Sequence, residues 1–545
     1  MTSPLSRREF VALSAAGAAV VSGAAPAVAQ AAPAATAGTD AHAAQREDAL
    51  FEKGVAELGA MMARGELTSR ALTERYLQRI AAMDKAGPAV NALIELNPEA
   101  AAIAAQRDAE RKAGKVRGPL HGIPVIIKDN IDTADQMHTT AGSLALAGSR
   151  PARDAFIVQQ LREAGAVLLG KTNLSEWANY RSTRSTSGWT GRGGLTRNPY
   201  VLDRNTSGSS SGTGAGIAAD FATVGIGTET DGSIISPSAI CGLVGIKPTV
   251  GLWSRSGIIP ISASQDTAGP MARTVADAAV LLGALTGVDP RDAATTASRG
   301  HALGDYAAAL QAGGLRGARI GVARAQAGFN PDVDRRFDEA IATMKDAGAV
   351  IVDPASLPTP AALGSAETIV LDTEFKAGLS AYFEARGGNP EVRSLADIIA
   401  WNDRHADGEM PWFGQEIMLR AQKSGPLTDK KYLAARATCL RLTRTQGIDA
   451  VMTKHRLDAI VLPSNQPAWT TDLLNGDHFT GGDTTYAAVA GYPSITVPMG
   501  LVHELPVGVS FIGRAWTEAA LLRYAFAFEQ ATKARRAPGY RATLG

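Results

Sequence analysis

The segment 205–216 combines serines and glycines in spacings that suit acyl transfer or the binding of a nucleotide. Its Gly208-x-Ser210-x-Gly212 spacing satisfies the G-x-S-x-G motif, in which an exposed serine attacks a carbonyl carbon. That motif requires a strand directly before the serine, and residues 203–207 have the composition of a turn. An esterase of the α/β-hydrolase type that uses Ser210 therefore stays an alternative rather than the favoured interpretation.

Two further interpretations compete for the same segment. Gly214-x-Gly216-x-x-Ala219 satisfies a loose dinucleotide-binding fingerprint, but it also lacks a preceding strand. The composition alone is also that of a flexible Ser/Gly linker. A linker would not normally lie between two well-patterned segments, so neither interpretation is favoured.

Several longer motifs occur in one order along the chain. They are Lys-Asp-Asn at 128–130, Gly-Ser-Ser-Ser-Gly at 208–212, Gly-Thr-Glu-Thr-Asp-Gly-Ser-Ile at 227–234, Cys-Gly-Leu-Val-Gly-Ile-Lys-Pro-Thr at 241–249, Gln-Asp-Thr-Ala-Gly-Pro-Met-Ala-Arg at 265–273 and Gly-Tyr-Pro-Ser-Ile-Thr-Val-Pro at 491–498. Together they resemble the amidase signature family over nearly the whole chain after the first 50 residues. The variant at 227–233, together with Arg192 to Pro199, is most similar to the peptide amidase branch, whose members release ammonia from C-terminal peptide amides.

The resemblance implies a catalytic role for three residues. Ser233 corresponds to the nucleophile, and Ser209 corresponds to a bridging serine that follows a cis peptide bond after Gly208. Lys128 corresponds to the base. A lysine acts as a base only when it is neutral, and Lys128 ends the apolar run 125–127, where burial would favour the neutral form.

The resemblance also implies an oxyanion hole made by the backbone N–H groups of Thr230, Asp231, Gly232 and Ser233. Many family members have glycine where this chain has Asp231, and arginine where it has Ile235. A backbone donor survives at Asp231, so these departures are expected to alter the surroundings and the substrate rather than the type of reaction.

Other residues are expected to support the site or to line a substrate pocket. These are Ser187, Ser210, Ser211, Gly208, Trp412, Phe413 and Trp469. The family resemblance implies no metal and no cofactor, and a small-molecule or short-peptide amide as the substrate. Two alternatives remain besides the esterase: an amidotransferase subunit of the same family, and a catalytically inactive exported binding protein on the same scaffold.

The elements around these motifs alternate between helix and strand. Thr68 is expected to cap a helix with its apolar face at Leu72, Tyr76, Ile80 and Met83. Helices are also expected over 153–163, 217–221 and from 332 to about Gly348, and a loop over 288–304. Strands are expected at 125–127, 166–169, 319–322, 349–352, 459–462, 494–497 and 507–511. This alternation predicts an α/β fold, with a single large α/β/α domain and a central mixed β-sheet covered by helices.

Composition excludes several classes of protein. The chain has 545 residues, of which 45% are hydrophobic, and 54 basic residues balance 53 acidic ones. A disordered protein would be poorer in apolar residues and more strongly charged. The near-zero net charge gives no support for a nucleic-acid partner. Cys241 and Cys439 are too few for a disulfide framework.

The first residues have the composition of an export signal. Arg7-Arg8 precedes an uncharged Ala/Val/Gly-rich stretch that ends in the small residues 27–29, and this pattern is typical of a twin-arginine signal. We expect a signal peptide at 1–29, a flexible lead-in at 30–47 and an amidase signature domain at 48–545. The protein is therefore expected to be periplasmic or secreted, with no membrane segment once the signal is cleaved.

Overall fold

The computed structural model of the protein describes residues 48–388 and 390–545. The predicted signal peptide and lead-in lie outside the described residues, so they stay predictions. Within the described ranges, no helix is both long enough and apolar enough to cross a bilayer.

An 11-stranded mixed sheet forms the centre of the molecule. Its strands lie in the order β1-β3-β2-β6-β8-β7-β12-β13-β11-β9-β10. Their bounds are β1 (Leu93–Leu96), β2 (Pro124–Lys128), β3 (Val167–Thr172), β6 (Val224–Glu229), β7 (Val244–Lys247), β8 (Thr267–Ala272), β9 (Arg319–Val322), β10 (Val350–Val352), β11 (Ala459–Pro463), β12 (Ser494–Val502) and β13 (Leu505–Ile512). A separate two-stranded sheet pairs β4 (Trp189–Thr190) with β5 (Gly194–Leu195).

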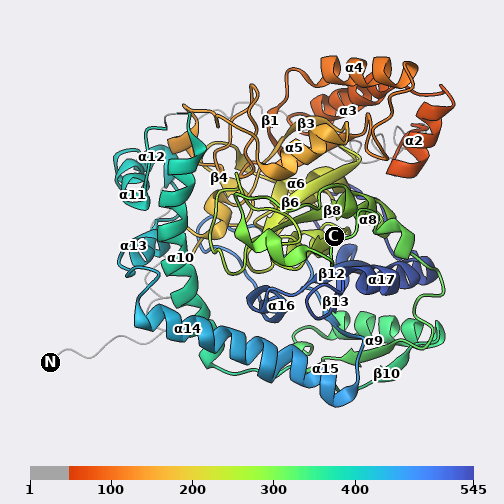
Figure 1. Cartoon of the computed structure of the whole chain (residues 1–545), viewed down its shortest axis with the longest axis vertical. Helices are drawn as coiled ribbons and strands as arrows, with labels where there is room; N and C mark the ends of the chain where they lie inside the picture. The colour runs from red at the N-terminus through yellow and green to blue at the C-terminus, as the bar shows by residue number, and fades with distance from the viewer. Residues whose placement is uncertain (1–47, 389) are drawn as a thin grey trace, which may run out of the picture.

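Helices surround the sheet (Figure 1). Contacts to its strands come from α3, α4, α8, α9 and α17, and from the short central helices α6 and α7. A further group, α10 to α15, runs along the left and lower edges in Figure 1. The bounds are α2 (Val55–Ala63), α3 (Ser69–Met83), α4 (Ala100–Lys112), α5 (Phe156–Glu163), α6 (Ser211–Ala218), α7 (Ile235–Ile240), α8 (Val275–Ala284), α9 (Pro331–Asp346), α10 (Ala362–Arg386), α11 (Leu395–Arg404), α12 (Ala406–Glu409), α13 (Glu416–Gln422), α14 (Lys430–Leu440), α15 (Asp449–His455), α16 (Thr485–Ala490) and α17 (Glu518–Thr532).

The predicted fold class is confirmed, and so is the pattern of several elements. The Thr68 side chain accepts a hydrogen bond from the N–H of Ala71 and caps α3, whose predicted apolar face is buried. All seven predicted strands are present. The strand predicted at 349–352 is β10, which lies at one edge of the 11-stranded sheet beside β9 and leaves Val350 exposed.

The helix predicted at 217–221 is wrong in position. The helix is α6, which begins within the Ser/Gly-rich segment and is fully buried. A Cβ on Gly212 would lie 2.3 Å from the Ala92 carbonyl oxygen and 2.5 Å from that of Asn173. Tight packing therefore favours a helix of small residues here, although glycine has a low helix propensity. The same burial shows that the segment is not a flexible linker.

Two other boundaries differ from prediction. The helix predicted from 153 begins at Phe156, and the predicted loop 288–304 contains a short 3₁₀ helix, Ala293–Ser298. The side chain of Asp292 caps that turn by accepting the N–H of Ala294. A turn signal in the sequence marks such a segment as irregular but does not resolve a single helical turn.

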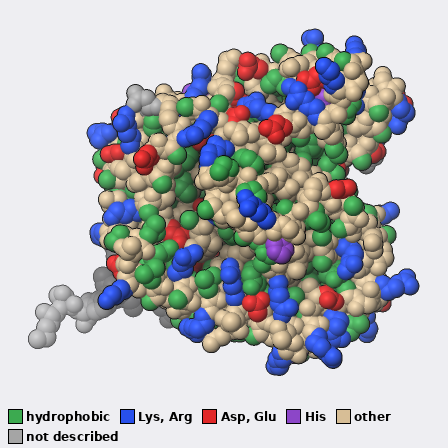
Figure 2. All heavy atoms as spheres, viewed as in Figure 1, with side chains coloured by type: hydrophobic (Ala, Val, Ile, Leu, Met, Phe, Trp, Pro, Cys, Tyr) green, Lys and Arg blue, Asp and Glu red, His purple; other side chains and the backbone are tan. Residues whose placement is uncertain are grey.

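The surface carries charges of both signs. On the face shown in Figure 2, lysine and arginine side chains are scattered among acidic and apolar ones. This agrees with the near-zero net charge of the sequence. The absence of a nucleic-acid partner stays a prediction.

Candidate active site

Lys128 is the last residue of β2 and is fully buried. Its Nζ lies 2.7 Å from Ser209 Oγ, 2.9 Å from Thr228 Oγ1 and 3.2 Å from the Thr228 carbonyl oxygen. β2 and β6 are parallel neighbours with Ile127 opposite Ile226, so Lys128 and Thr228 reach the same edge of the sheet. The ends of two adjacent strands thus place the amine and its partners.

The surroundings of the amine favour its neutral form. Burial lowers the pKa of Lys128 to about 7, against the opposing attraction of the Glu229 and Asp266 carboxylates. A neutral amine has two N–H donors and one lone pair. The Thr228 carbonyl oxygen can only accept a hydrogen bond, whereas a hydroxyl can also donate. Neutral Lys128 can therefore donate twice to Thr228 and accept the Ser209 hydroxyl proton, as a base must.

Ser209 follows a cis peptide bond from Gly208, as the resemblance implies. A Cβ on Gly208 would lie 2.1 Å from Ser175 Oγ and 3.1 Å from Ser187 Oγ, so only glycine fits at this junction. The carbonyl oxygen of Ser209 accepts the N–H of Ser175 at 3.0 Å. The backbone of Ser209 is thereby fixed on one side while its hydroxyl faces Lys128.

Ser233 lies at the end of the loop 230–233, between β6 and α7. Its carbonyl oxygen accepts the N–H of Ser210 at 3.2 Å, which joins this loop to the segment that carries Ser209. Within the described ranges, Ser233 Oγ makes no hydrogen bond, and the residue is 8% exposed. A hydroxyl without a structural partner, on a loop joined to the segment that carries Ser209, suits a nucleophile.

The loop 230–233 also presents unused backbone donors. None of its four N–H groups donates a hydrogen bond within the part of the chain that the structure describes. The next two N–H groups, those of Ile234 and Ile235, both donate to Glu229 Oε2, at 2.7 and 2.9 Å. Gly232 has φ +81°, a left-handed conformation that favours glycine. Free N–H groups on a fixed loop can stabilise a developing oxyanion.

Neighbouring segments hold this loop at three points. Thr230 Oγ1 donates to Asp266 Oδ1 at 2.6 Å, and Gln265 Nε2 donates to the Thr230 carbonyl oxygen at 3.3 Å. Asp231 accepts the hydroxyls of Thr484 and Thr485 at 2.5 and 2.7 Å. The residue that departs from the family pattern therefore ties the loop to the start of α16.

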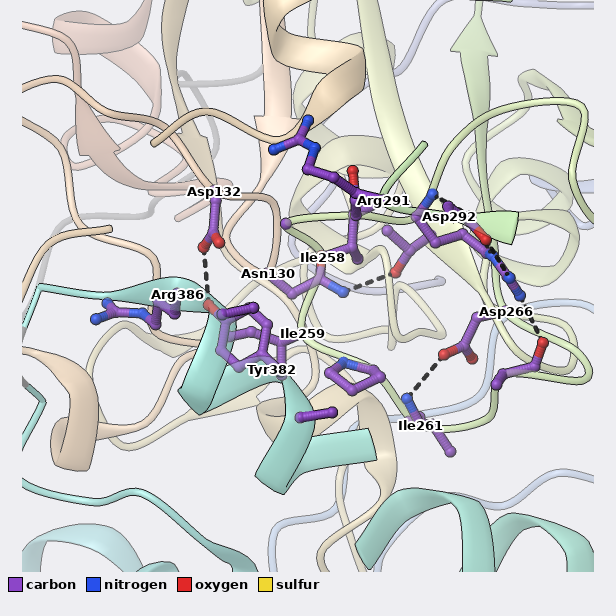
Figure 3. A pocket seen from close by; sticks show the side chains of 18 of the residues that line it. Asn130, Asp132, Ile258, Ile259, Ile261, Asp266, Arg291, Asp292, Tyr382 and Arg386 are labelled. Atoms are coloured by element: carbon purple, nitrogen blue, oxygen red, sulfur yellow. Dashed lines mark hydrogen bonds and ion pairs between the residues drawn. The ribbon is translucent and has the colours of Figure 1, made fainter. Parts of the chain in front are cut away.

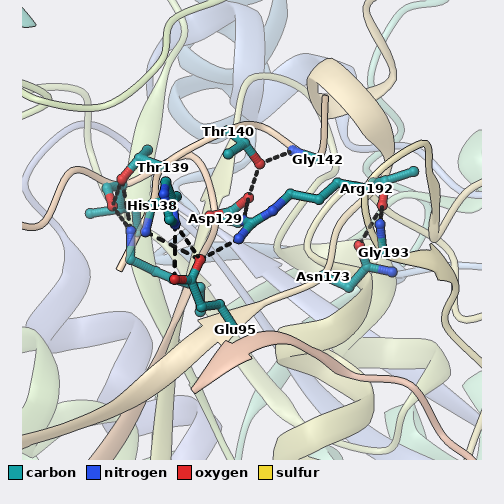
Figure 4. Close-up of polar contacts among 12 residues, drawn as sticks. Glu95, Asp129, His138, Thr139, Thr140, Gly142, Asn173, Arg192 and Gly193 are labelled. Carbon is teal, nitrogen blue, oxygen red and sulfur yellow. Dashed lines mark hydrogen bonds and ion pairs between the residues drawn. The ribbon is translucent and has the colours of Figure 1, made fainter. Parts of the chain in front are cut away.

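A polar network fixes the chain directly after Lys128 (Figure 4). Asp129 accepts the hydroxyl of Thr140 and lies 3.5 Å from the guanidinium of Arg192. Arg192 also pairs with Glu95, whose carboxylate lies 3.0 Å from His138 Nδ1. These contacts join side chains, and none of them involves Lys128 Nζ. His138 therefore has a structural partner in Glu95.

The other predicted serines lie around this centre. Ser210 Oγ donates to the Thr228 carbonyl oxygen at 3.1 Å and accepts the Thr228 N–H at 3.2 Å. Ser211 Oγ donates to the carbonyl oxygen of Ser207 at 2.6 Å. The Ser187 hydroxyl accepts the amide of Asn179 at 3.1 Å. All three serines thus hold backbone or side chains in place, and no histidine of the described ranges hydrogen-bonds to Ser210.

Of the predicted aromatic residues, Phe413 and Trp469 have aromatic packing partners. Phe413 packs edge to face against Trp189, with ring centroids 5.1 Å apart, and Trp412 is 42% exposed. Trp469 packs against Phe479 and donates to Asp477 at 3.2 Å. Their roles in binding substrate stay predictions. No group of three or more His, Cys, Asp and Glu residues in the described ranges could hold a metal ion.

Some residues of the site were not predicted. Thr228, Asn130 and Gln265 all lie inside the quoted motifs, and their hydrogen bonds depend on strands that are distant in sequence. Glu367 comes from α10 and accepts the Gln265 amide at 2.9 Å. No motif marks Glu367, so only the structure reveals it.

Comparisons with curated proteins match nearly the whole described chain. The family model for Amidase matches residues 71–522. A probable amidase of Arabidopsis thaliana is 42% identical over 87% of this chain and 89% of its own length. A glutamyl-tRNA(Gln) amidotransferase subunit of Chloroflexus aurantiacus is 36% identical over 87% of this chain and 95% of its own length.

Comparisons with solved structures point to the same family. The native peptide amidase of Stenotrophomonas maltophilia is 52% identical, covers 90% of this chain and 99% of its own, and has a TM-score of 0.86. An amidase family protein of Bacillus anthracis is 35% identical, covers 92% of this chain and 94% of its own, and has a TM-score of 0.82. With the family model, these likenesses establish that the chain belongs to the amidase signature family of amide-hydrolysing enzymes.

Proposed function

We propose that this amidase cleaves C-terminal peptide amides to the acid and ammonia through an acyl-enzyme formed on Ser233. The observation that carries the mechanism is the 2.7 Å contact between the buried amine of Lys128 and Ser209 Oγ. The structural likeness to a peptide amidase supports the choice of substrate. The predicted signal peptide supports a role outside the cytoplasm.

Acylation begins with a relay of protons. Neutral Lys128 takes the proton of Ser209 as Ser209 takes the proton of Ser233, and Ser233 Oγ attacks the carbonyl carbon. The free N–H groups of the loop 230–233 receive the oxyanion. Lys128 then returns its proton to Ser209 as Ser209 gives a proton to the amide nitrogen, and the carbon–nitrogen bond breaks so that ammonia leaves. Water attacks the acyl-enzyme by the same relay and restores Ser233.

The test is release of ammonia by residues 30–545. The panel contains C-terminally amidated peptides, simple aliphatic amides and aryl amides, with Ser233→Ala as the control. We expect release from peptide amides by the unmodified enzyme alone. Release from only small or aryl amides would keep the mechanism and exclude the peptide substrate, and no release at all would overturn the proposal.

Activity is expected to depend on pH through Lys128. The base works when neutral, and burial lowers the pKa of Lys128 to about 7, so kcat/KM should rise about tenfold per pH unit below pH 7 and level off above it. A discontinuous ammonia assay from pH 5 to pH 9 measures this profile. A rate that still climbs at pH 9 would show an unperturbed lysine and contradict the assignment.

Gln265 is expected to act as a positioning residue for the oxyanion loop. Its amide donates to the Thr230 carbonyl oxygen and to Glu367, so Gln265→Leu should loosen the loop without touching substrate. We expect kcat to fall about 10- to 100-fold with little change in KM. Gln415→Leu is the matched control, because that buried amide donates to Ile399 and Asp403 in the layer of α11 and α13. Equal losses in both variants would indicate a general effect on the fold.

A further inference from the structure

A buried glutamate of α10, Glu367, lies beside the loop 230–233 and takes no part in the proton relay. The residue is 9% exposed. Its Oε1 accepts the amide of Gln265 at 2.9 Å, and its carboxyl group shares a hydrogen bond with the side chain of Asp231. A carboxylate can only accept a hydrogen bond, so one of the two carboxyl groups must carry a proton. One member of the pair is therefore a neutral acid.

The hydrogen-bond partners of the pair place this proton on Glu367. Asp231 Oδ1 accepts the hydroxyl of Thr484 at 2.5 Å, and Asp231 Oδ2 accepts that of Thr485 at 2.7 Å. Such donors stabilise an ionised carboxylate. Apart from Asp231, Glu367 has only the amide of Gln265 as a donor in the described ranges. Burial, and then the negative charge of Asp231, raise the pKa of Glu367 to about 8, so its O–H group donates to Asp231.

Further ionisable groups face the pair from other elements. They are Asp483 before α16, Cys439 on α14, Lys247 on β7 and Glu229 at the end of β6. Lys247 loses its charge in the same pH range as Glu367, because burial lowers its pKa to about 8. A pH profile of the enzyme must therefore be compared with that of a variant that lacks only the ionisation of Glu367.

Glu367 holds the loop 230–233 at two points. It binds Asp231 directly, and it orients Gln265, whose Nε2 also donates to the Thr230 carbonyl oxygen at 3.3 Å. Thr230 and Asp231 supply two of the free backbone N–H groups that are proposed to receive the oxyanion. Such donors stabilise a transition state only when they are already in place before the reaction. The contacts of Glu367 therefore act on the part of the site that needs a fixed shape.

The helix that carries Glu367 is docked against the same stretch of chain as Gln265. Two turns further along α10, Glu374 accepts the hydroxyls of two serines of the segment 262–265, at 2.5 and 2.6 Å. Glu367 and Glu374 are seven residues apart, so both project from one face of the helix. The last turns of α10 instead line a cavity of about 350 Å³, which separates them from residues 255–261 (Figure 3). The two glutamates thus fix the first half of α10 to the segment that holds the loop.

We propose that Glu367 is a positioning residue of the reaction, because its carboxyl group joins Asp231 to Gln265 and so holds the loop 230–233 in the shape that the oxyanion requires. It acts through these two partners and not on the substrate. The proposal rests on the proposed function, since the oxyanion forms only if Ser233 attacks an amide. It also explains the carboxylate at 231, where many family members have glycine: this side chain is the point at which α10 holds the loop.

The proton determines whether the contact between the two carboxyl groups attracts or repels. Neutral Glu367 donates to Asp231, whereas an ionised Glu367 would place two negative charges against each other. Glutamine reproduces the neutral acid, because its carbonyl oxygen can accept the Gln265 amide and its own amide can donate to Asp231. Methionine has a similar length and makes neither hydrogen bond. The two substitutions therefore separate the hydrogen bonds from the volume of the side chain.

Release of ammonia from a C-terminally amidated peptide at pH 7 is the first test. We expect Glu367→Gln to keep kcat within about threefold of the parent, and Glu367→Met to lose about 10- to 100-fold in kcat with little change in KM. Glu529→Met is the matched control, because burial also raises the pKa of Glu529, to about 7, but its carboxyl group accepts the N–H of Val275 at the start of α8. It should keep the parental kcat. Urea unfolding of each variant reports on its fold.

The pH profile is a readout that a purely structural role would not move. Lys128 alone would give a plateau above pH 7, and ionisation of Glu367 should end that plateau above about pH 8, where the pair begins to repel. Glu367→Gln should keep its rate to a higher pH than the parent. A second assay of each sample after its return to pH 7 separates this reversible loss from inactivation.

A double variant tests whether Glu367 acts through Asp231. Asp231→Ala keeps the backbone N–H and removes the carboxylate. If part of the effect of Glu367 passes through that carboxylate, Glu367→Met should lower kcat less in the Asp231→Ala protein than in the parent. Equal effects in both backgrounds would overturn this coupling and the proposal with it.

The remaining outcomes separate this proposal from the proposed function. A Glu367→Met enzyme with the parental kcat would overturn the positioning role, and so would equal losses in Glu367→Gln and Glu367→Met. If Glu367→Met does not fold, the alkaline side of the profile decides, because an equal fall in the parent and in Glu367→Gln would overturn the shared proton. In each of these cases the parent is active. If the parent releases no ammonia from any amide, the proposed function itself fails.

Discussion

Replacing Lys128 with methionine is expected to abolish amide hydrolysis and to stabilise the fold below neutral pH. Removal of the base leaves Ser209 with no acceptor for its proton, so kcat should fall about 10⁴-fold or more. The gain in stability has a separate cause. Burial lowers the pKa of Lys128 from 10.5 to about 7, which means that folding disfavours the charged amine.

The size and sign of this gain depend on pH. A pKa lowered from 10.5 to about 7 destabilises the folded state by about 5 kcal/mol below pH 7, and the penalty fades as pH rises toward 10.5. At pH 9 the remaining penalty is about 2 kcal/mol. Methionine also loses three hydrogen bonds of about 1 kcal/mol each, so the variant should gain about 2 kcal/mol of stability at pH 6 and lose about 1 kcal/mol at pH 9.

Urea unfolding of both proteins at pH 6 and pH 9 measures the difference. Lys171→Met is the matched control, since Lys171 is also fully buried but donates to the Ile131 carbonyl oxygen and lies near Asp129 and Asp132. Its loss removes one of the cations that face these two buried acids and should destabilise the fold. A Lys128→Met protein that is less stable than the parent at pH 6 would contradict the buried neutral base.

Replacing Ser233 with alanine is expected to reduce kcat about 10⁴-fold or more while leaving the fold intact. Ser233 Oγ makes no hydrogen bond within the described ranges, so its removal costs no structural contact. The bond between the Ser233 carbonyl oxygen and the Ser210 N–H involves only backbone and should persist. Ammonia release and a urea transition on the same preparation test both halves of the expectation.

Ser210→Ala is the decisive comparison for the esterase alternative. Its hydroxyl bonds to the backbone of Thr228, so the variant should keep much of its activity and lose stability. After the enzyme has reacted with an activated ester and has been denatured, mass spectrometry should find the acyl group on Ser233. An adduct on Ser210, or a Ser233→Ala protein with normal turnover, would exclude the proposed nucleophile.

The sequence predicts those parts of the fold that local patterns determine. The cap at Thr68 and the apolar stripe of α3 are local, and the structure confirms them. Strands β6, β7 and β8 are not predicted, because their glycines dilute the apolar pattern. Helix α6 begins earlier than the helix propensities of its residues suggest. Its early start depends on close packing against Ala92 and Asn173, which are distant in the sequence.

For the candidate site, too, the sequence predicts the residues in contiguous motifs but not their distant partners. The motifs locate Lys128, Ser209 and the loop 230–233, because each lies in a contiguous stretch with a specific pattern. The partners that set their geometry come from elsewhere in the chain. Glu367, on α10, accepts the amide of Gln265, which holds the loop, and Thr484, before α16, donates to Asp231 in the loop. Each lies more than 100 residues from its partner in the sequence. No spacing rule links them, so only the folded chain brings them together.

The strand order has a consequence for synthesis on the ribosome. β7 lies between β8 and β12 in the sheet. Residues 244–247 therefore cannot form their hydrogen bonds to the second neighbouring strand until residues 494–502 have been synthesised. α7, which follows Ser233, contacts β12 and β13 as well. A nascent chain that already contains all three proposed catalytic residues therefore still lacks the strands that pack against β7 and α7. Hydrolytic activity should emerge abruptly, when the last strands leave the exit tunnel, and premature termination should yield inert polypeptide rather than a weaker enzyme.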